Sequence, residues 1–202
     1  MPRGSSTSRR FARNAISAVL LAGGESRRMG KDKATLPFRR KPLWQIQLEL
    51  LRKLQPIEIL VSARTDPVWR PADVQFVADE PPSHGPMSGL AASLAKMRAK
   101  YLLALAVDMP FMTEEYLMYL YRQTKPSRGV IAKVDERFEP LAAIYPREAL
   151  AMMQNALSGK DFSLQTVASR LIAEGKLQVT PVTSQERKFF LNVNELADLP
   201  TQ

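Results

Sequence analysis

Short apolar runs alternate with longer amphipathic segments along most of this 202-residue chain. The apolar runs have the length typical of buried strands, and they lie at residues 16–21, 57–61, 75–78, 101–107, 129–133, 141–145 and 177–182. Apolar residues recur at helical spacing in between, at residues 43–54, 90–97, 113–121, 147–157 and 163–174, and a short final helix is expected after Asn194. This alternation predicts a three-layer α/β/α Rossmann-like sandwich with a mostly parallel sheet.

The expected strand at 101–107 carries the clearest boundary signal. Its apolar run stops at Asp108, and Met109 and Pro110 follow. Because proline has no backbone N–H, the ladder ends here and the Asp108 carboxylate emerges at the carboxyl end of the strand. We expect this strand to be central in the sheet. We expect Asp108 either to bind a metal ion or to cap the helix that begins near Thr113.

A glycine loop with several cations follows the first expected strand. Gly23 and Gly24 lack a Cβ atom, so backbone N–H groups there can approach an anion closely. The positive charge comes from Arg27, Arg28, Lys31 and Lys33. Ligands of open α/β sheets bind beyond the carboxyl ends of the strands, where this loop is expected to lie. The pattern indicates a phosphate-binding loop, although a flexible basic surface loop has the same composition.

Two common phosphate-binding motifs are excluded by their spacing. A Walker A loop has four residues between its glycines, then Lys and then Ser or Thr. Here five residues separate Gly24 from Gly30, and Asp32 follows Lys31. A dinucleotide fingerprint needs two glycines one residue apart, and the loop contains no such pair. The loop belongs to neither class.

Composition bounds the size and location of the protein. A hydrophobic content of 45% over 202 residues supports one core, which we assign to a single domain at residues 15–202. Residues 1–14 are rich in Ser and Arg and poor in apolar residues, so we expect a disordered basic leader. The sequence has no apolar run long enough for a membrane span, no secretory signal pattern and no cysteine, so we expect a cytoplasmic protein.

The net charge of +9 is concentrated near the glycine loop. Residues 1–53 hold 13 Lys or Arg and only 3 Asp or Glu, so the rest of the chain is almost neutral. A nucleic-acid surface usually spreads its cations along a face with aromatic residues for stacking, and aromatic residues are scarce in this segment. A local positive field favours a polyanionic small molecule, and we expect no nucleic-acid partner.

Six landmarks in order resemble the MobA-like nucleotidyltransferase family. The first is the segment 21–33, where Leu-Ala-Gly-Gly is followed by Ser26, Arg-Met-Gly and an Asp-Lys pair. The others are Lys41-Pro42-Leu43-Trp44, Asp79 with Gly85-Pro86-Met87-Ser88-Gly89, Asp108-Met109-Pro110, Pro140-Leu141 and Asn192-Val193-Asn194. The resemblance extends over residues 15–199, and six landmarks in order make it far more specific than the loop alone.

The resemblance implies a fold, a reaction and a set of site residues. The fold is that of the nucleotide-diphospho-sugar transferases. The reaction is the Mg²⁺-dependent transfer of GMP from GTP to molybdopterin, with release of pyrophosphate. The residues implied in nucleotide binding are Leu21, Ala22, Gly23, Gly24, Lys33, Ser62, Asp79 and Asp108, with Asp108 as the metal ligand. Lys33, Asp108 and Arg28 are implied in catalysis, and Pro140, Asn192 and Asn194 in pterin binding.

Two departures from the family pattern leave alternatives open. The family often has Asn where this chain has Ser62, and often has His where it has Glu139. Gly24 resembles the guanylyl-specific pattern and favours GTP as the nucleotide. The alternatives are a cytidylyltransferase of the same cofactor, which uses CTP, a transferase that acts on a sugar phosphate or other phosphorylated acceptor, and a catalytically silent nucleotide-binding module. Without the resemblance, Asp79 reads as a polar loop residue, and Asn192 and Asn194 as turn residues. We expect a monomer or weak oligomer that receives its pterin from a handover protein.

Overall fold

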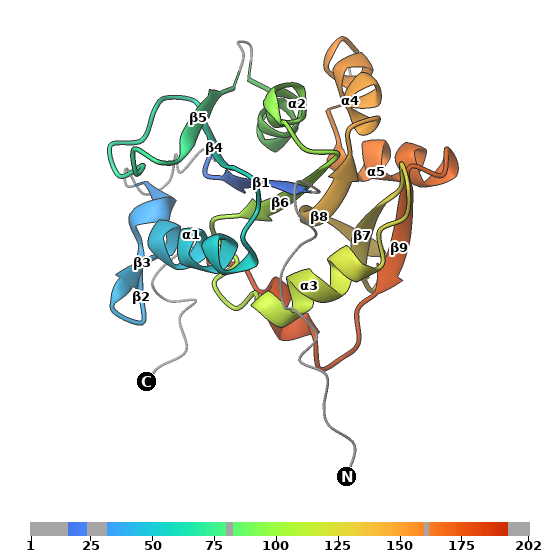
Figure 1. Cartoon of the computed structure of the whole chain (residues 1–202). Helices are drawn as coiled ribbons and strands as arrows, with labels where there is room; N and C mark the ends of the chain where they lie inside the picture. The colour runs from blue at the N-terminus through green and yellow to red at the C-terminus, as the bar shows by residue number, and fades with distance from the viewer. Residues whose placement is uncertain (1–15, 24–31, 80–82, 160–161, 194–202) are drawn as a thin grey trace.

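The computed structural model describes residues 16–23, 32–79, 83–159 and 162–193. Seven strands form one sheet in the order β5-β4-β1-β6-β8-β7-β9, and helices cover both of its faces (Figure 1). The strands are β1 Ile16–Leu21, β4 Ile59–Ala63, β5 Gln75–Ala78, β6 Tyr101–Ala106, β7 Gly129–Val134, β8 Arg137–Pro146 and β9 Leu177–Pro181. The predicted three-layer sandwich is confirmed. In the described part of the chain, no helix is both long and apolar enough to cross a membrane.

Parallel pairing dominates the half of the sheet that holds the first landmarks. β1 pairs in parallel with β4 and β6, and β4 pairs in parallel with β5. β8 runs antiparallel to both β6 and β7, while β9 is parallel to β7. The strand ending before Asp108 is therefore the middle strand of seven, as predicted. The carboxyl ends of β1, β4, β5 and β6 meet at one edge of the sheet.

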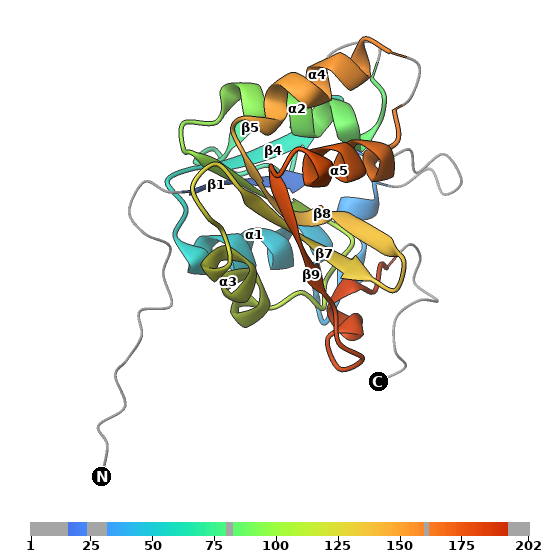
Figure 2. The ribbon, with the colours of Figure 1, turned by 90° about the vertical axis from the view of Figure 1, so that its right-hand side faces the viewer.

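Alternation along the strands divides the core between the two faces. Ile16, Ala18 and Leu20 of β1 pack into the cluster under α1 (Leu43–Leu54) and α3 (Glu114–Arg122). Val19 and Leu21 point to the other face. There they pack into the cluster that α2 (Pro86–Lys96), α4 (Ala149–Leu157) and α5 (Leu164–Ala173) cover, and Figures 1 and 2 show the two helical layers. Strands buried on both faces explain the nearly continuous apolar runs in the sequence.

Short elements near the glycine loop were not predicted. A 3₁₀ turn, η1 (Lys33–Thr35), precedes a hairpin of β2 (Pro37–Phe38) and β3 (Lys41–Pro42). The hairpin turn is Arg39-Arg40, and both residues have positive φ. Turns of this kind favour Asn or Gly, and because neither is present the sequence gives no signal of the turn. A second 3₁₀ turn, η2 (Arg187–Phe190), was also missed. The leader and the helix expected after Asn194 lie outside the described residues.

Two strands differ from the prediction by two or more residues. The strand expected at 141–145 begins four residues earlier, because β8 runs from Arg137 to Pro146. The other strand is shifted by two residues. The apolar run predicted a strand at 57–61, whereas β4 is Ile59–Ala63. The side chain of Glu58 is instead tied into polar contacts just before the strand, where it accepts hydrogen bonds from Ser17 Oγ at 2.6 Å and from the Arg98 backbone N–H at 2.6 Å. At the other end, Ser62 pairs within the sheet with Val77 although it is polar.

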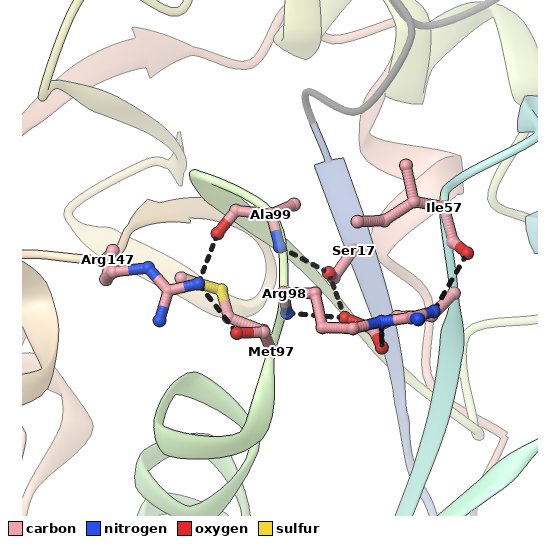
Figure 3. Close-up of polar contacts among 7 residues, drawn as sticks. Ser17, Ile57, Met97, Arg98, Ala99 and Arg147 are labelled. Carbon is pink, nitrogen blue, oxygen red and sulfur yellow. Dashed lines mark hydrogen bonds and ion pairs between the residues drawn. The ribbon is translucent and has the colours of Figure 1, made fainter.

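The polar network around Glu58 joins the amino ends of β1, β4 and β6 (Figure 3). This edge of the sheet is opposite the one that Asp79 and Asp108 follow. Arg98 Nε also donates to Glu58 at 2.7 Å, and Ser17 Oγ accepts from the Ala99 N–H at 3.2 Å. Arg147 Nη2 donates to the carbonyl oxygens of Met97 and Ala99 at 2.6 and 2.7 Å. These contacts fix the turn between α2 and β6, and thereby the register of the central strand.

Candidate nucleotide site

The predicted site residues gather at the carboxyl edge of the sheet. Ala22 follows β1 and donates its N–H to the Ser62 carbonyl of β4 at 2.9 Å. The Asp79 N–H donates to the Ala63 carbonyl at 3.1 Å, so the residue after β5 is fixed against β4. Leu21, which is buried, accepts from the Val107 N–H at 3.1 Å. Parallel pairing thus brings four separate segments of the chain to the same edge of the sheet.

Asp79 is a buried carboxylate and not the exposed loop residue that its local sequence suggests. Only 7% of the residue is exposed. Ser62 Oγ, itself buried, donates to Asp79 Oδ1 at 2.8 Å, and Ser83 Oγ donates to Oδ2 at 3.4 Å. A buried carboxylate is costly unless hydrogen-bond donors satisfy it, and these two hydroxyls do so. Ser62 therefore orients Asp79.

Two glycines allow the backbone to approach this pair. A Cβ atom on Gly23 would lie 3.1 Å from Asp79 Oδ2. A Cβ atom on Gly89, in α2, would lie 2.4 Å from Ser62 Oγ and 3.1 Å from Asp79 Oδ1. Gly23 was a predicted site residue, whereas Gly89 was only a landmark of the resemblance. A glycine inside a helix, where it is intrinsically unfavourable, was the signal for its role.

Lys33 and Asp108 form an ion pair across the crevice. Lys33 Nζ lies 2.7 Å from Asp108 Oδ2, although 75 residues separate the two in the chain. Their side chains are 28% and 17% exposed, so the pair is accessible from solvent. Lys33 is the first residue of η1, and Asp108 follows β6 directly after Val107. The sequence predicted both residues for one site but did not predict this contact.

The backbone around Asp108 is held from two sides. The Val193 N–H donates to the Asp108 carbonyl at 2.8 Å, which places the exposed Asn192 beside the crevice. Gln47, fully buried in α1, donates Nε2 to the Met109 carbonyl at 2.5 Å. Sequence analysis missed Gln47, and its only signal was a polar residue on the apolar face of a helix. Thr113 caps α3, accepting from the Tyr116 N–H at 3.3 Å, so Asp108 is not the cap.

Pro140 and Glu139 lie on β8, the strand next to β6. Pro140 is buried, and its carbonyl accepts from Tyr145 Oη at 2.7 Å. The antiparallel register pairs Leu105 with Ala142, so these two residues lie toward the same edge as Asp108. Burial raises the pKa of Glu139 to about 7, against the opposing effect of Arg137. Gly24, Arg28 and Asn194, like Arg27 and Lys31, lie outside the described residues.

Residues 18–177 match the sequence profile of the MobA-like NTP transferase domain. The chain belongs to this family. A probable molybdenum cofactor guanylyltransferase of Opitutus terrae is 35% identical over 188 residues, which are 92% of this chain and 93% of the relative. The molybdenum cofactor guanylyltransferase of Syntrophotalea carbinolica is 31% identical, over 90% of this chain and 88% of the relative.

A solved structure shares the fold of this MobA-like transferase. Molybdopterin-guanine dinucleotide biosynthesis protein A from Archaeoglobus fulgidus superposes with a TM-score of 0.74 at 24% identity. The superposition covers 90% of this chain and 94% of that one. The family and the nucleotidyltransferase fold predicted from the sequence are both confirmed, and the chain is accordingly a nucleotidyltransferase.

MobA-like transferases generally use a divalent metal, and the crevice fits one. Asp108 offers a hard oxygen ligand at a strand end, partly open to solvent. Magnesium is typically held by one or two carboxylates, with water and substrate phosphates completing its shell. Among the described residues there is no cluster of three or more His, Cys, Asp or Glu side chains that would form a closed protein cage. A cation at Asp108 would take its remaining ligands from water and substrate phosphates.

Proposed function

We propose that this chain is a molybdenum cofactor guanylyltransferase that joins GMP from GTP to molybdopterin. The terminal phosphate oxygen of molybdopterin attacks the α-phosphorus of GTP in line. A new P–O bond forms, the bond between the α-phosphorus and the bridging oxygen to the β-phosphate breaks, and pyrophosphate leaves. The observation that carries the proposal is the Lys33–Asp108 pair at 2.7 Å, which joins a cation and a metal-type ligand at the carboxyl end of β6.

Lys33 acts on the triphosphate in this proposal. Its ammonium stabilises the negative charge that develops on the leaving pyrophosphate. Asp108 pairs with this ammonium at 2.7 Å, so the proposal requires Lys33 to turn from the carboxylate to the phosphates when the nucleotide binds. Gly24 and Arg28 of the loop are proposed to add a backbone N–H group and a second cation.

Asp108 is proposed to hold Mg²⁺, which would neutralise phosphate charge and keep the α-phosphate in line with the attacking oxygen. The residue is suited to this task because its position is fixed. Val193 and Gln47 hold the backbone on each side of it, at 2.8 and 2.5 Å. The chemistry needs no covalent enzyme intermediate, and positioning with charge neutralisation is the main catalytic contribution.

The guanine nucleotide is proposed to lie against Leu21, Ala22 and Gly23, with Asp79 and Ser62 beyond them. Ser62 orients Asp79 through Oδ1, and Oδ2 faces Gly23, where it also accepts the long hydrogen bond from Ser83 at 3.4 Å. The pterin is proposed to approach from the opposite side of Asp108, along Pro140, Asn192 and Asn194. A handover protein that delivers the pterin, and a monomeric or weakly oligomeric state, remain predictions.

Cytidylyl transfer is the second candidate, because Ser62 replaces the Asn that the family often has. A thermal-shift panel with GTP, CTP, ATP and UTP in the presence of Mg²⁺ separates the two. A ligand at a hundredfold excess over its Kd stabilises the folded state by about 2.7 kcal/mol. We expect GTP to give the largest shift, and a larger shift with CTP would overturn the guanylyl assignment.

Catalysis is tested by pyrophosphate release with GTP, Mg²⁺ and molybdopterin. We expect release that depends on the pterin and is lost in Asp108→Ala. Pyrophosphate release at the wild-type rate in that variant would contradict the role of Asp108. Tight GTP binding without release from any phosphorylated acceptor would instead indicate a silent nucleotide-binding module.

A further inference from the structure

Asp32 divides its carboxylate between two partners. Its Oδ1 accepts the N–H of Ala34 at 2.9 Å and thereby caps the turn that begins at Lys33. Its Oδ2 accepts the indole Nε1–H of Trp69 at 2.8 Å. The Asp32 carbonyl also accepts the N–H and the hydroxyl of Thr35, at 2.9 and 2.7 Å. The residue directly before Lys33 is therefore the point at which η1 is tied to a distant part of the chain.

Trp69 is itself held in place. It lies on the connection between β4 and β5, and its ring stacks on Trp44 of α1 with the centroids 5.3 Å apart and the planes 12° from parallel. Both rings are half-buried against the core under α1. The neighbouring Arg70 braces the connection, because its guanidinium donates to both carboxylate oxygens of Asp66 at 2.6 and 2.7 Å.

We propose that Trp69 is a positioning residue for Lys33, acting through its hydrogen bond to Asp32. This inference rests on the proposed catalytic role of Lys33. A lysine side chain has four rotatable bonds, so the direction of its charge depends on how firmly its backbone is fixed. The Trp44–Trp69 stack fixes Asp32 from outside the turn, and Asp32 fixes the first residue of η1. The ammonium is thereby held toward Asp108, with Nζ 2.7 Å from Oδ2.

The hydrogen bond can be removed without removing the stack. Trp69→Phe keeps an aromatic ring on Trp44 but lacks the N–H donor. Asp32→Asn keeps an acceptor for the Ala34 N–H but presents an amide donor to the indole. For each variant we expect kcat of guanylyl transfer to fall about tenfold, since a small misplacement of a catalytic group has effects of this order. The GTP Kd should change less than threefold, because the backbone and Asp79 contacts remain.

A double-mutant cycle distinguishes positioning from general damage. If one hydrogen bond transmits the effect, the double variant Asp32→Asn/Trp69→Phe is no slower than the slower single variant. The matched control is Trp44→Phe, which keeps the stack and the indole donor and should retain the wild-type kcat. A wild-type kcat in Trp69→Phe overturns the proposal, and so do single effects that multiply in the double variant.

Fluorescence provides a readout that does not depend on the reaction. Trp44 and Trp69 are the only tryptophans in the chain, so Trp44→Phe leaves Trp69 as the sole indole reporter. We expect GTP with Mg²⁺ to change its emission with the Kd measured by calorimetry, and we expect Asp32→Asn to abolish that change. This result without transfer to molybdopterin would refute the proposed function but support positioning. Calorimetric GTP binding with constant Trp69 emission would overturn positioning alone.

Discussion

Replacing Gly89 by Ala tests whether the Ser62–Asp79 pair needs the close approach of α2. Alanine is intrinsically better than glycine in a helix by about 1 kcal/mol, so an open site would gain stability. Here the new Cβ would lie 2.4 Å from Ser62 Oγ, 3.1 Å from Asp79 Oδ1 and 3.2 Å from Leu21 Cδ2. Such contacts occur only if the neighbours move, and the first to move is the serine hydroxyl that orients Asp79.

The expected loss of free energy is the balance of two costs and one gain. Overpacking a core costs about 1–3 kcal/mol, and a lost hydrogen bond to a charged group costs about 1.5–3 kcal/mol. Both exceed the gain in helix propensity, so we expect a net cost of about 2 kcal/mol at the Asp79 side of the site. If this cost falls on nucleotide binding, GTP affinity decreases roughly 30-fold.

Isothermal titration of GTP with Mg²⁺ into four proteins checks this reasoning. The proteins are the wild type, Gly89→Ala, Ser62→Ala and the double variant. Removing the Ser62 hydroxyl removes the closest contact, so the double variant should bind GTP within a few-fold of Ser62→Ala alone. Wild-type affinity in Gly89→Ala would refute the steric argument. A double variant whose loss equals the two single losses combined would show that the hydroxyl is not the atom displaced.

Three further variants probe charge. Burial alone would raise the pKa of Glu58, but hydrogen bonds from Ser17 and Arg98 outweigh it and lower the pKa. The ionised Glu58 therefore stabilises the folded state above pH 4.5, and this stabilisation is lost as acid protonates the carboxylate. Urea unfolding of Glu58→Gln should show a loss of about 2 kcal/mol in unfolding free energy at pH 7 that shrinks below pH 4. Burial raises the pKa of Glu139 to about 7, so wild-type stability should fall as pH rises from 5 to 8. Glu139→Gln should be more stable than the wild type by about 1 kcal/mol at pH 8 but not at pH 5; this difference is reduced because the side chain is partly exposed. Lys33→Met should lower kcat by roughly 100-fold. Its unfolding free energy should change by less than about 1 kcal/mol, because a partly exposed ion pair contributes little to stability. A large loss of stability would assign Lys33 a structural role instead.

Local sequence patterns predicted the elements that carry the landmarks. The apolar run before Asp108 and the following proline fixed the end of β6, and α3 begins next to Thr113, where a helix was expected to begin. These signals are local. A strand buried on both faces is apolar along its own length, and the missing N–H of a proline interrupts the ladder at that residue. The start of β4 was misplaced by two residues, because Ile57 and Glu58 hydrogen-bond to β1 through their backbone but precede the strand.

Contacts between distant segments could not be predicted in this way. Ser62, Asp79 and Gly89 come from three elements, and their packing depends on parallel pairing that places the strand ends together. The Asp32–Trp69 hydrogen bond joins residues 37 apart through a connection with no periodic pattern. The resemblance supplied Asp79 as a site residue, but only the fold shows that Ser62 orients it and that Gly89 makes room for it.

Transfer of labelled GMP is the most direct test of the central claim, which is that Lys33 and Asp108 form the catalytic centre of a guanylyltransferase. The measurement is the initial rate at which label from [α-³²P]GTP enters molybdopterin, in the wild type and in Asp108→Asn, with CTP as the competing donor. We predict label in the pterin product with the wild type and GTP, little with CTP, and a rate reduced roughly 100-fold or more in Asp108→Asn. Labelling at the wild-type rate in Asp108→Asn, or from CTP in preference to GTP, would contradict the account.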